Sequence, residues 1–340
     1  MTTVNRPAGL PSIPVIDFQH LLAGGRVRAA AVDALADAAA QWGFLELRGH
    51  GVPPVHREKL FRVQRAFFDL PGAEKAKLVR TEANARGYNP GELTKNRRDA
   101  KEIFDFGHKP DPEAADDAPV NRVADGWNQF PAELPGFAAA VWRWYGYCET
   151  LSWLLLEALG EALGQPREAL TEAFGAEHTS FLRLNHYPER PRGALADAPD
   201  LPDGELGIHH HTDAGVLTLL VQEGDPGLQV RHGGAWHLVA PEDDAIVVNI
   251  GDMMQVYAND AFLAPEHRVL ATRPGGRRQS AAFFFNPAYD AVIAPFAEAP
   301  RYRPFTWGEF RGRRAAGDYA DLGEEVQIAA WRTHAGGARS

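Results

Sequence analysis

The sequence predicts an α+β fold in which a helical N-terminal half packs on a β-rich core. Up to about residue 178, apolar residues recur every three to four positions, which is the spacing of amphipathic helices. From about residue 179, short alternating or apolar runs are separated by Gly and Pro turns, which is typical of a sandwich or barrel. The 340 residues are 45% hydrophobic and 24% charged, an ordinary composition for a globular protein.

The first half contains most of the expected helices. An Ala-rich amphipathic segment and a long segment around Cys148 give the clearest helical periodicity. In chain order we expect a strand over 13–18, a helix over 26–41, a strand over 43–48, a helix over 54–70, a loop over 108–128 and helices over 133–163 and 166–174.

The second half contains the expected β-core and ends in a helical segment rich in large aromatic residues. We therefore divide the chain into a mostly helical region (1–178), a β-core (179–290) and a C-terminal helical segment (291–340) that covers one barrel end, all within one continuous unit. The expected strands are 180–187, 216–222, 227–230, 235–239, 245–250, 267–271 and 279–286.

Composition and charge exclude several classes of protein. The formal net charge of −10 argues against a partner bound through phosphate contacts. No apolar run approaches the roughly 18 residues that a membrane span needs, and the N-terminus lacks a secretory pattern. The single cysteine excludes a disulfide framework and a four-cysteine iron–sulfur site. We expect a cytoplasmic monomer that binds a small molecule and neither nucleic acid nor a membrane.

A possible metal site is the most informative feature of the chain. His211 and Asp213 are two positions apart, so on a strand both side chains point to one side. With His267 as a third ligand they form the two-His-one-carboxylate set of non-haem iron oxygenases, which leaves one face of the metal free. One His-x-Asp among 13 histidines could also be a surface loop or an adventitious metal binder. Arg278, which follows His267, could hold a carboxylate beside the metal.

Several segments together resemble the isopenicillin N synthase-like branch of the iron(II)/2-oxoglutarate-dependent dioxygenases, over roughly residues 13–310. The resemblance implies a double-stranded β-helix, or jelly roll, with the metal inside one mouth of the barrel. It rests on Ile13–Asp17, Trp42–Val52, Phe67–Pro71, Arg86–Tyr88, Lys101–Gly107, Arg183–Pro188 and the pattern from His211 to Ser280.

The resemblance also implies site residues and a reaction. His211, Asp213 and His267 would bind Fe(II). Arg278, Ser280, Asn185 and Tyr187 would bind 2-oxoglutarate, with Arg278 pairing with its distal carboxylate. Dioxygen is the second co-substrate, and no catalytic side chain is expected beyond the metal ligands. Decarboxylation of 2-oxoglutarate to succinate would be coupled to hydroxylation, desaturation or cyclisation of a small molecule of secondary metabolism.

The primary substrate is not readable, but five residues are candidates for binding it. They share strand faces with the proposed site or lie in the N-terminal half: Arg183, Glu102, Phe104, His209 and Phe284. The Pro/Gly-rich segment 189–206 is a candidate lid.

Three alternatives remain open from the residues. The first is an oxidative cyclase of the same family that does not use 2-oxoglutarate. The second is a zinc hydrolase built on His211, Asp213 and His267. The third is a metal-binding protein without enzymatic activity.

Overall fold

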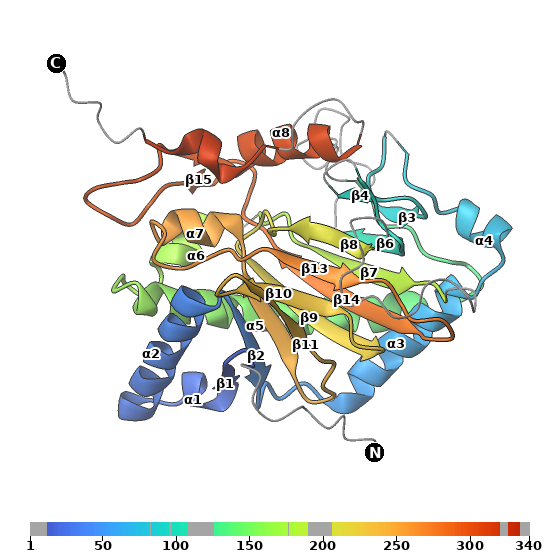
Figure 1. The fold of residues 1–340 in the computed structure, drawn as a ribbon, viewed down its shortest axis with the longest axis horizontal. Coiled ribbons are helices and arrows are strands. Elements are labelled where there is room, and N and C mark those ends of the chain that lie inside the picture. The colour runs from blue at the N-terminus through green and yellow to red at the C-terminus, as the bar shows by residue number, and fades with distance from the viewer. Residues whose placement is uncertain are drawn as a thin grey trace.

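Two β-sheets face one another and form the core of the protein (Figure 1). The computed structural model describes residues 12–81, 83–94, 97–107, 126–175, 177–189, 206–319 and 326–333. The larger sheet has the order β1 (Val15–Asp17), β2 (Phe44–Arg48), β12 (Ile246–Ile250), β9 (Leu217–Gly224), β14 (Arg278–Phe285), β7 (Phe181–Tyr187), β6 (Glu102–Gly107) and β3 (Gly87–Asn89). The smaller sheet has the order β11 (Ala235–Val239), β10 (Leu228–His232), β13 (His267–Leu270) and β8 (Leu206–His211).

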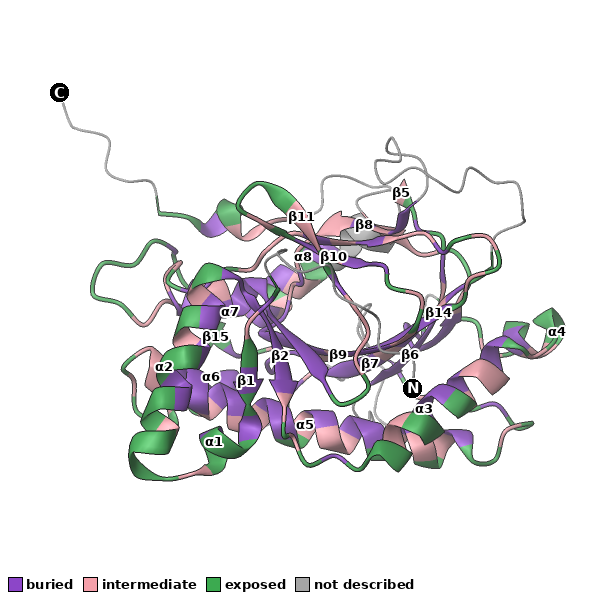
Figure 2. Cartoon of the chain, turned by 60° about the horizontal axis from the view of Figure 1, so that its bottom comes forward, coloured by how far each residue is buried: buried purple, intermediate pink, exposed green. Residues whose placement is uncertain are grey.

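Helices cover the outer face of the larger sheet, as Figure 2 shows. The longest, α5 (Phe137–Ala162), runs along β9 and β14 and contacts both α2 (Gly25–Gln41) and α3 (Pro54–Phe68). Its buried side chains recur every three or four residues, so one face of the helix lies on the sheet: Phe137, Val141, Trp144, Cys148, Leu151 and Leu155.

The remaining elements are short or lie at the barrel end. They are α1 (Phe18–Leu22), α4 (Gly72–Ala76), the pair β4 (Leu93–Thr94) and β5 (Arg97–Arg98), α6 (Ala169–Phe174), α7 (Asp252–Tyr257), the pair β15 (Val292–Ile293) and β16 (Phe305–Thr306), α8 (Trp307–Tyr319) and a 3-10 helix, Ile328–Trp331.

The alternation along β14 explains how polar side chains reach the inside of the barrel. Successive side chains on a strand point to opposite faces of the sheet. Ala281, Phe283 and Phe285 are buried in the core beneath the helices. Arg278 and Ser280 face the interior between the two sheets, where they line a cavity. One strand therefore supplies both the packed core and the polar lining.

Most expected elements are present, but several short ones were not predicted. They are strands β3 to β6 and helices α1, α4 and α7. The expected strand at His211 is β8, which begins at the last residue of the expected loop over 189–206. The C-terminal segment opens with β15 and β16 before its helix. Two loops were expected, at 108–128 and at 189–206, and the second is the candidate lid. Most of each lies outside the described residues. Among the helices that the structure describes, none has the length and apolar character to span a membrane.

Candidate active site

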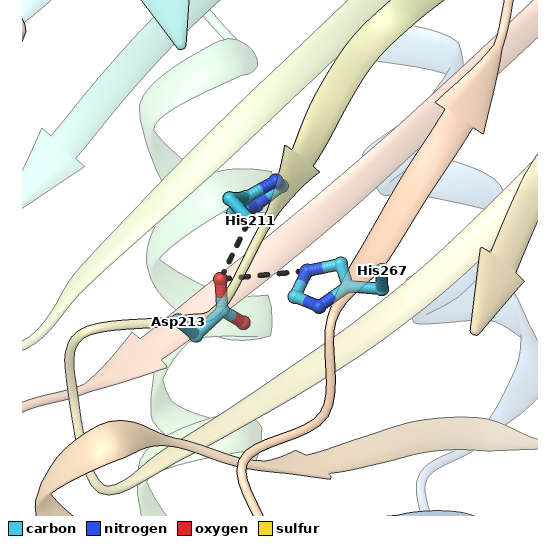
Figure 3. Close-up of side chains that lie close together, drawn as sticks. All are labelled: His211, Asp213 and His267. Carbon is cyan, nitrogen blue, oxygen red and sulfur yellow. Dashed lines mark ion pairs between the residues drawn. The ribbon is translucent and has the colours of Figure 1, made fainter. Parts of the chain in front are cut away.

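The structure brings His211, Asp213 and His267 together inside the barrel. His211 is the last residue of β8 and stands opposite His267, the first residue of β13. The sequence suggested that Asp213 shares a strand with His211. In the structure, Asp213 instead lies in the turn that follows β8. Its Oδ1 atom lies 3.6 Å from Nε2 of His211 and 3.6 Å from Nε2 of His267 (Figure 3).

Backbone carbonyls fix which nitrogen of each imidazole faces the centre. Nδ1 of His211 lies 2.7 Å from the carbonyl oxygen of His209, and Nδ1 of His267 lies 3.3 Å from that of Pro265. A carbonyl can only accept, so each Nδ1 carries the proton and donates. The Nε2 lone pairs are therefore left toward Asp213, which is the tautomer that a metal ligand needs.

The Asp213 carboxylate is oriented in the same way. Its Oδ2 atom accepts hydrogen bonds from Thr218 Oγ1 at 2.5 Å and Asn249 Nδ2 at 2.8 Å. Oδ1 is left facing the two imidazoles. Both donors come from the larger sheet, β9 and β12, so the opposite wall of the barrel aims this oxygen.

The electrostatics of the three groups favour a cation. Burial alone would raise the pKa of Asp213, but the two histidines outweigh it and hold that pKa well below its ordinary value. Burial lowers the pKa of His211. For His267, burial would lower the pKa, but Asp213 outweighs it and raises the pKa.

These residues fit a divalent metal ion. The three ligand atoms lie within 4.8 Å of one another. The 3.6 Å from Asp213 Oδ1 to each Nε2 is within the roughly 4.2 Å that two metal–ligand bonds of about 2.1 Å can span. Two imidazoles and one carboxylate are the donor set of non-haem iron sites that keep open positions.

Arg278 forms the second half of the site. Its side chain is buried and donates hydrogen bonds to Gln222 Oε1 at 2.8 Å and to the carbonyl of Asp225 at 3.2 Å. Its guanidinium lies 5.0 Å from the ring centre of Tyr187, and burial lowers its pKa. Within the described residues it forms no ion pair with an acidic side chain. A buried cation whose hydrogen-bond partners are all neutral is costly, so this position suits a carboxylate of a ligand.

Neighbouring strands place further polar groups beside Arg278. In the β14–β7 register, Arg278 pairs with Tyr187 and Ser280 pairs with Asn185. Asn185 Nδ2 donates to Ser280 Oγ at 3.3 Å, while the buried Asn185 Oδ1 has no hydrogen-bond partner among the described residues. Arg278, Ser280, Asn185 and Tyr187 thus form one polar wall, as the sequence predicts.

A cavity of about 770 Å³ joins this wall to the three metal-binding candidates. Apolar side chains line part of it, among them Phe44, Leu220, Leu228 and Val269. Elsewhere its wall is charged. Arg80, Glu92, Lys101 and Arg183 come from the first half of the chain and β7, and Arg311 and Arg314 come from α8.

Of the five candidate substrate residues, Arg183 and Phe284 line the cavity and the other three do not. Glu102 and Phe104 lie on the opposite face of β6. Glu102 pairs with Lys75 at 2.8 Å, and Phe104 is fully buried against Phe67 and Phe137. The prediction that Glu102 and Phe104 line the pocket was wrong, because both side chains are on the face of β6 that is turned away from the cavity.

His209 was also wrongly placed, because β8 contains an irregularity. His211 pairs with His267 but Ile208 pairs with Val269, so β8 has one extra residue between these pairs. Such a bulge shifts the alternation by one. Ile208 therefore lines the cavity, while the backbone N–H and Nδ1 of His209 contact Asp99.

A chain of buried charges was not anticipated from the sequence. Arg183 forms a bidentate pair with Asp105 at 2.7 and 2.8 Å and also contacts Glu92. Glu92 contacts Lys101 at 2.7 Å. Arg183 lies 78 residues from Asp105 in the sequence, and no spacing signals their contact. Burial alone would raise the pKa of Glu92, but Arg183, Lys101 and Arg80 outweigh it and lower the pKa to about 2.

Comparison with known proteins identifies the family. A profile described as the 2OG-Fe(II) oxygenase superfamily matches residues 178–287, and one described as non-haem dioxygenase in morphine synthesis N-terminal matches residues 13–133. Gibberellin 2-beta-dioxygenase 8 of Arabidopsis thaliana is 30% identical over 324 residues, which cover 95% of this chain and 87% of that protein. The chain belongs to the 2OG-Fe(II) oxygenase superfamily.

Other similar proteins give the same result. Leucoanthocyanidin dioxygenase 1 of Oryza sativa subsp. japonica is 31% identical over 89% of this chain and 80% of its own. The crystal structure of a full-length Neurospora crassa protein in complex with alpha-KG has a TM-score of 0.76 and 27% identity, over 89% of this chain and 96% of that one. JOX2 in complex with 2OG, Fe and JA has a TM-score of 0.72 and 29% identity, over 90% and 86%.

Membership decides between the alternatives that the residues left open. The protein is an Fe(II)/2-oxoglutarate-dependent dioxygenase that acts on small metabolites, with the jelly-roll core of that family. Fe(II) is its metal and 2-oxoglutarate its co-substrate. Membership sets aside the zinc hydrolase and the non-enzymatic binding protein, and the 2-oxoglutarate bound in the similar structures argues against the cyclase.

Proposed function

We propose that His211, Asp213 and His267 hold Fe(II), and that Arg278, Ser280, Asn185 and Tyr187 bind 2-oxoglutarate in the same cavity. The observation that carries the proposal is the pairing of two incomplete sites. One is a set of three ligand atoms within 4.8 Å of one another, and the other is a buried arginine whose hydrogen-bond partners among the described residues are all neutral. When bound, Fe(II) and 2-oxoglutarate supply oxidative decarboxylation to succinate and the oxidation of a substrate C–H bond by dioxygen.

In this proposal the side chains of the protein bind 2-oxoglutarate and orient the metal ligands. Arg278 forms a charge-assisted pair with the distal carboxylate of 2-oxoglutarate, and the Ser280 hydroxyl donates a second hydrogen bond to it. Thr218 and Asn249 keep Asp213 Oδ1 directed at the metal. The apolar lining around Phe44, Leu220 and Leu228 excludes water, which strengthens the electrostatic contacts. No side chain is required as a general base.

We infer that the primary substrate is a small polar metabolite that is hydroxylated, desaturated or cyclised. Arg183, Glu92 and Lys101 line the cavity as one network of ion pairs. A purely hydrocarbon-like substrate would shield the exposed side of this network from water without offering it a hydrogen bond. Relatives at 30–31% identity bear the names of a gibberellin, a leucoanthocyanidin and an aminocyclopropane carboxylate enzyme. Identity at this level therefore does not select a substrate, and the charged wall is the better guide.

Anaerobic titration of the metal-free protein with Fe(II), followed by 2-oxoglutarate, tests the ligand assignment. We expect one Fe(II) per chain and a metal-to-ligand absorption band when 2-oxoglutarate is added. His267→Ala should lose both, whereas His237→Ala, a histidine of β11 outside the cavity, should lose neither. Retention of full iron affinity by His267→Ala would overturn the assignment.

The substrate class is tested by adding a panel of polar metabolites and of apolar terpenoids to the Fe(II)–2-oxoglutarate complex. A substrate should perturb the absorption band anaerobically and couple succinate formation to its own oxidation in air. Perturbation by polar compounds that is lost in Arg183→Met supports the proposal. Responses confined to terpenoids contradict the polar class but leave the metal and 2-oxoglutarate assignments intact.

A further inference from the structure

The C-terminal helix α8 reaches the residue that separates two of the proposed metal ligands. Nη2 of Arg314 donates a 2.9 Å hydrogen bond to the carbonyl of Thr212, which lies between His211 and Asp213. Nη1 of the same guanidinium contacts Asp252 Oδ2 at 3.0 Å. Only 5% of the Arg314 side chain and 3% of the Asp252 side chain are exposed, so both contacts are sheltered from water.

This turn depends on contacts from outside the sheet because β8 ends at His211. Asp213 therefore lacks strand pairing to fix its backbone. Instead, the start of α7 binds the turn: the backbone N–H of Asp252 donates to the Asp213 carbonyl at 2.7 Å, and that of Met253 donates to the Gly215 carbonyl at 3.0 Å. Asp252 thus holds Asp213 through its backbone and Arg314 through its side chain.

Contacts with the rest of the protein hold helix α8 at its first residue and hold the segment that follows the helix. Trp307 Nε1 donates to Thr179 Oγ1 at 2.8 Å at the start of the helix. Phe310 packs on the fully buried Trp331, and Arg332 forms a bidentate pair with Asp260 at 2.9 and 3.0 Å. Figure 1 shows α8 along the top of the view, above β8, and Arg314 contacts the residue that follows β8. The guanidinium of Arg314 therefore projects from a helix that is itself packed and hydrogen-bonded to the rest of the protein.

We propose that Arg314 is a positioning residue for the metal centre, and that the C-terminal helix sets metal affinity by fixing the turn that carries Asp213. The inference rests on the proposed role of His211, Asp213 and His267. Arg314 does not touch the metal in this scheme. It acts through the Thr212 carbonyl and Asp252, much as outer partners of metal ligands orient them elsewhere.

Anaerobic titration of the metal-free full-length chain with Co(II), a spectroscopic substitute for Fe(II), tests the inference. Arg314→Gln should weaken Co(II) binding by about tenfold, the lower end of the effect of losing an outer partner. Arg313→Gln is the matched control. It lies on the same helix, makes the same change in charge and has a half-exposed side chain that contacts Glu309. It should bind Co(II) like the wild type.

An effect on metal affinity is separated from an effect on stability by titrating well below the unfolding temperature of every metal-free variant. Because Arg314→Gln removes the cation that contacts the buried Asp252 charge, the double variant Arg314→Gln/Asp252→Asn is made as well. It restores neutrality and keeps the Asp252 backbone N–H. Weakened Co(II) binding in Arg314→Gln, or in the double variant if the single one does not fold, supports the inference.

One result would contradict the positioning role of Arg314, and another would contradict the metal site itself. Wild-type Co(II) affinity in Arg314→Gln, or in the double variant if the single one does not fold, overturns the positioning role. Wild-type protein that binds no Co(II), or binds it equally well after His267→Ala, overturns the metal site itself.

Discussion

The side-chain amide of Asn249 on β12 donates a 2.8 Å hydrogen bond to Oδ2 of Asp213, which follows β8 in the opposing sheet. The bond crosses the interior of the barrel and, with Thr218, satisfies the oxygen that does not face the histidines. Residues of the larger sheet therefore orient the Asp213 carboxylate, whereas the Asp213 backbone lies in the turn after β8 of the smaller sheet.

Asn249→Ala should weaken Fe(II) or Co(II) binding by roughly 10- to 100-fold, because a ligand that loses an outer partner is less well oriented. Thr218→Val should act in the same direction. Metal titration of the metal-free protein measures both, with Thr150→Val on the exposed side of α5 as the control for the threonine change. Unaltered metal affinity in both site variants would show that Asp213 needs neither donor.

Arg278→Met should separate ligand binding from stability. Loss of one member of a buried charge pair costs about 3–5 kcal/mol, so the Kd of 2-oxoglutarate should rise on the order of a hundredfold or more. The ligand-free protein should be no less stable, because a buried cation without an ionic partner is replaced by an apolar side chain of similar size. Anaerobic titration and urea unfolding measure the two effects.

Arg277→Met is the control for this change, since Arg277 is the exposed neighbour. It should alter neither quantity. Ser280→Ala should cost less than Arg278→Met, about 0.5–3 kcal/mol of 2-oxoglutarate binding, because one hydrogen bond is lost while the charge pair survives. An unchanged Kd in Arg278→Met would rule out the arginine as the carboxylate partner.

The polar wall around Arg278 was implied by the family resemblance, and alternation along the long, regular strands β7 and β14 supports it. Arg278 shares a strand face with Ser280, and Asn185 shares one with Tyr187, while their pairing across strands is visible only in the structure. The alternation does not say which face is the inner one. On β6 both faces are buried, with Phe104 beneath the helices and Asp105 beside Arg183, so burial does not tell which face is the inner one.

Other parts of the site lay beyond sequence reasoning for different physical reasons. The bulge in β8 shifts the alternation between Ile208 and His211 and is visible only in the pairing with β13. The contacts of Glu92 with Arg183, and of Arg314 with Thr212, join segments that no local period relates. Such contacts depend on how elements pack, which a single sequence does not encode as a pattern.

The corrected position of Phe104 has a testable consequence. Its ring is fully buried against Phe67 and Phe137, so Phe104→Ala should destabilise the protein by about 3–5 kcal/mol. Metal and 2-oxoglutarate affinities should not change below the unfolding transition. Phe284→Ala is the comparison, because Phe284 lines the cavity and is only partly buried. Equal loss of stability in the two variants would contradict this assignment of faces.

Glu92 should give the protein a measurable dependence of stability on pH. Although burial opposes it, the charges of Arg183, Lys101 and Arg80 lower the pKa of Glu92 from 4.5 to about 2 in the folded protein. A carboxyl group with a depressed folded-state pKa stabilises the fold above its unfolded pKa. That contribution is lost as the pH falls from about 4.5 toward 2, where the unfolded chain takes up the proton first.

Glu92→Gln should therefore be destabilised relative to the wild type by roughly 3–5 kcal/mol at neutral pH, the usual cost of breaking a buried pair. The difference should shrink below pH 4.5, because the wild type then loses the same contribution. Urea unfolding of both proteins between about pH 3 and 7 measures it, with Glu157→Gln at the surface pair with Arg167 as the control. A difference that stays constant or widens toward the acidic end would mean that Glu92 is not held ionised by its three cationic neighbours.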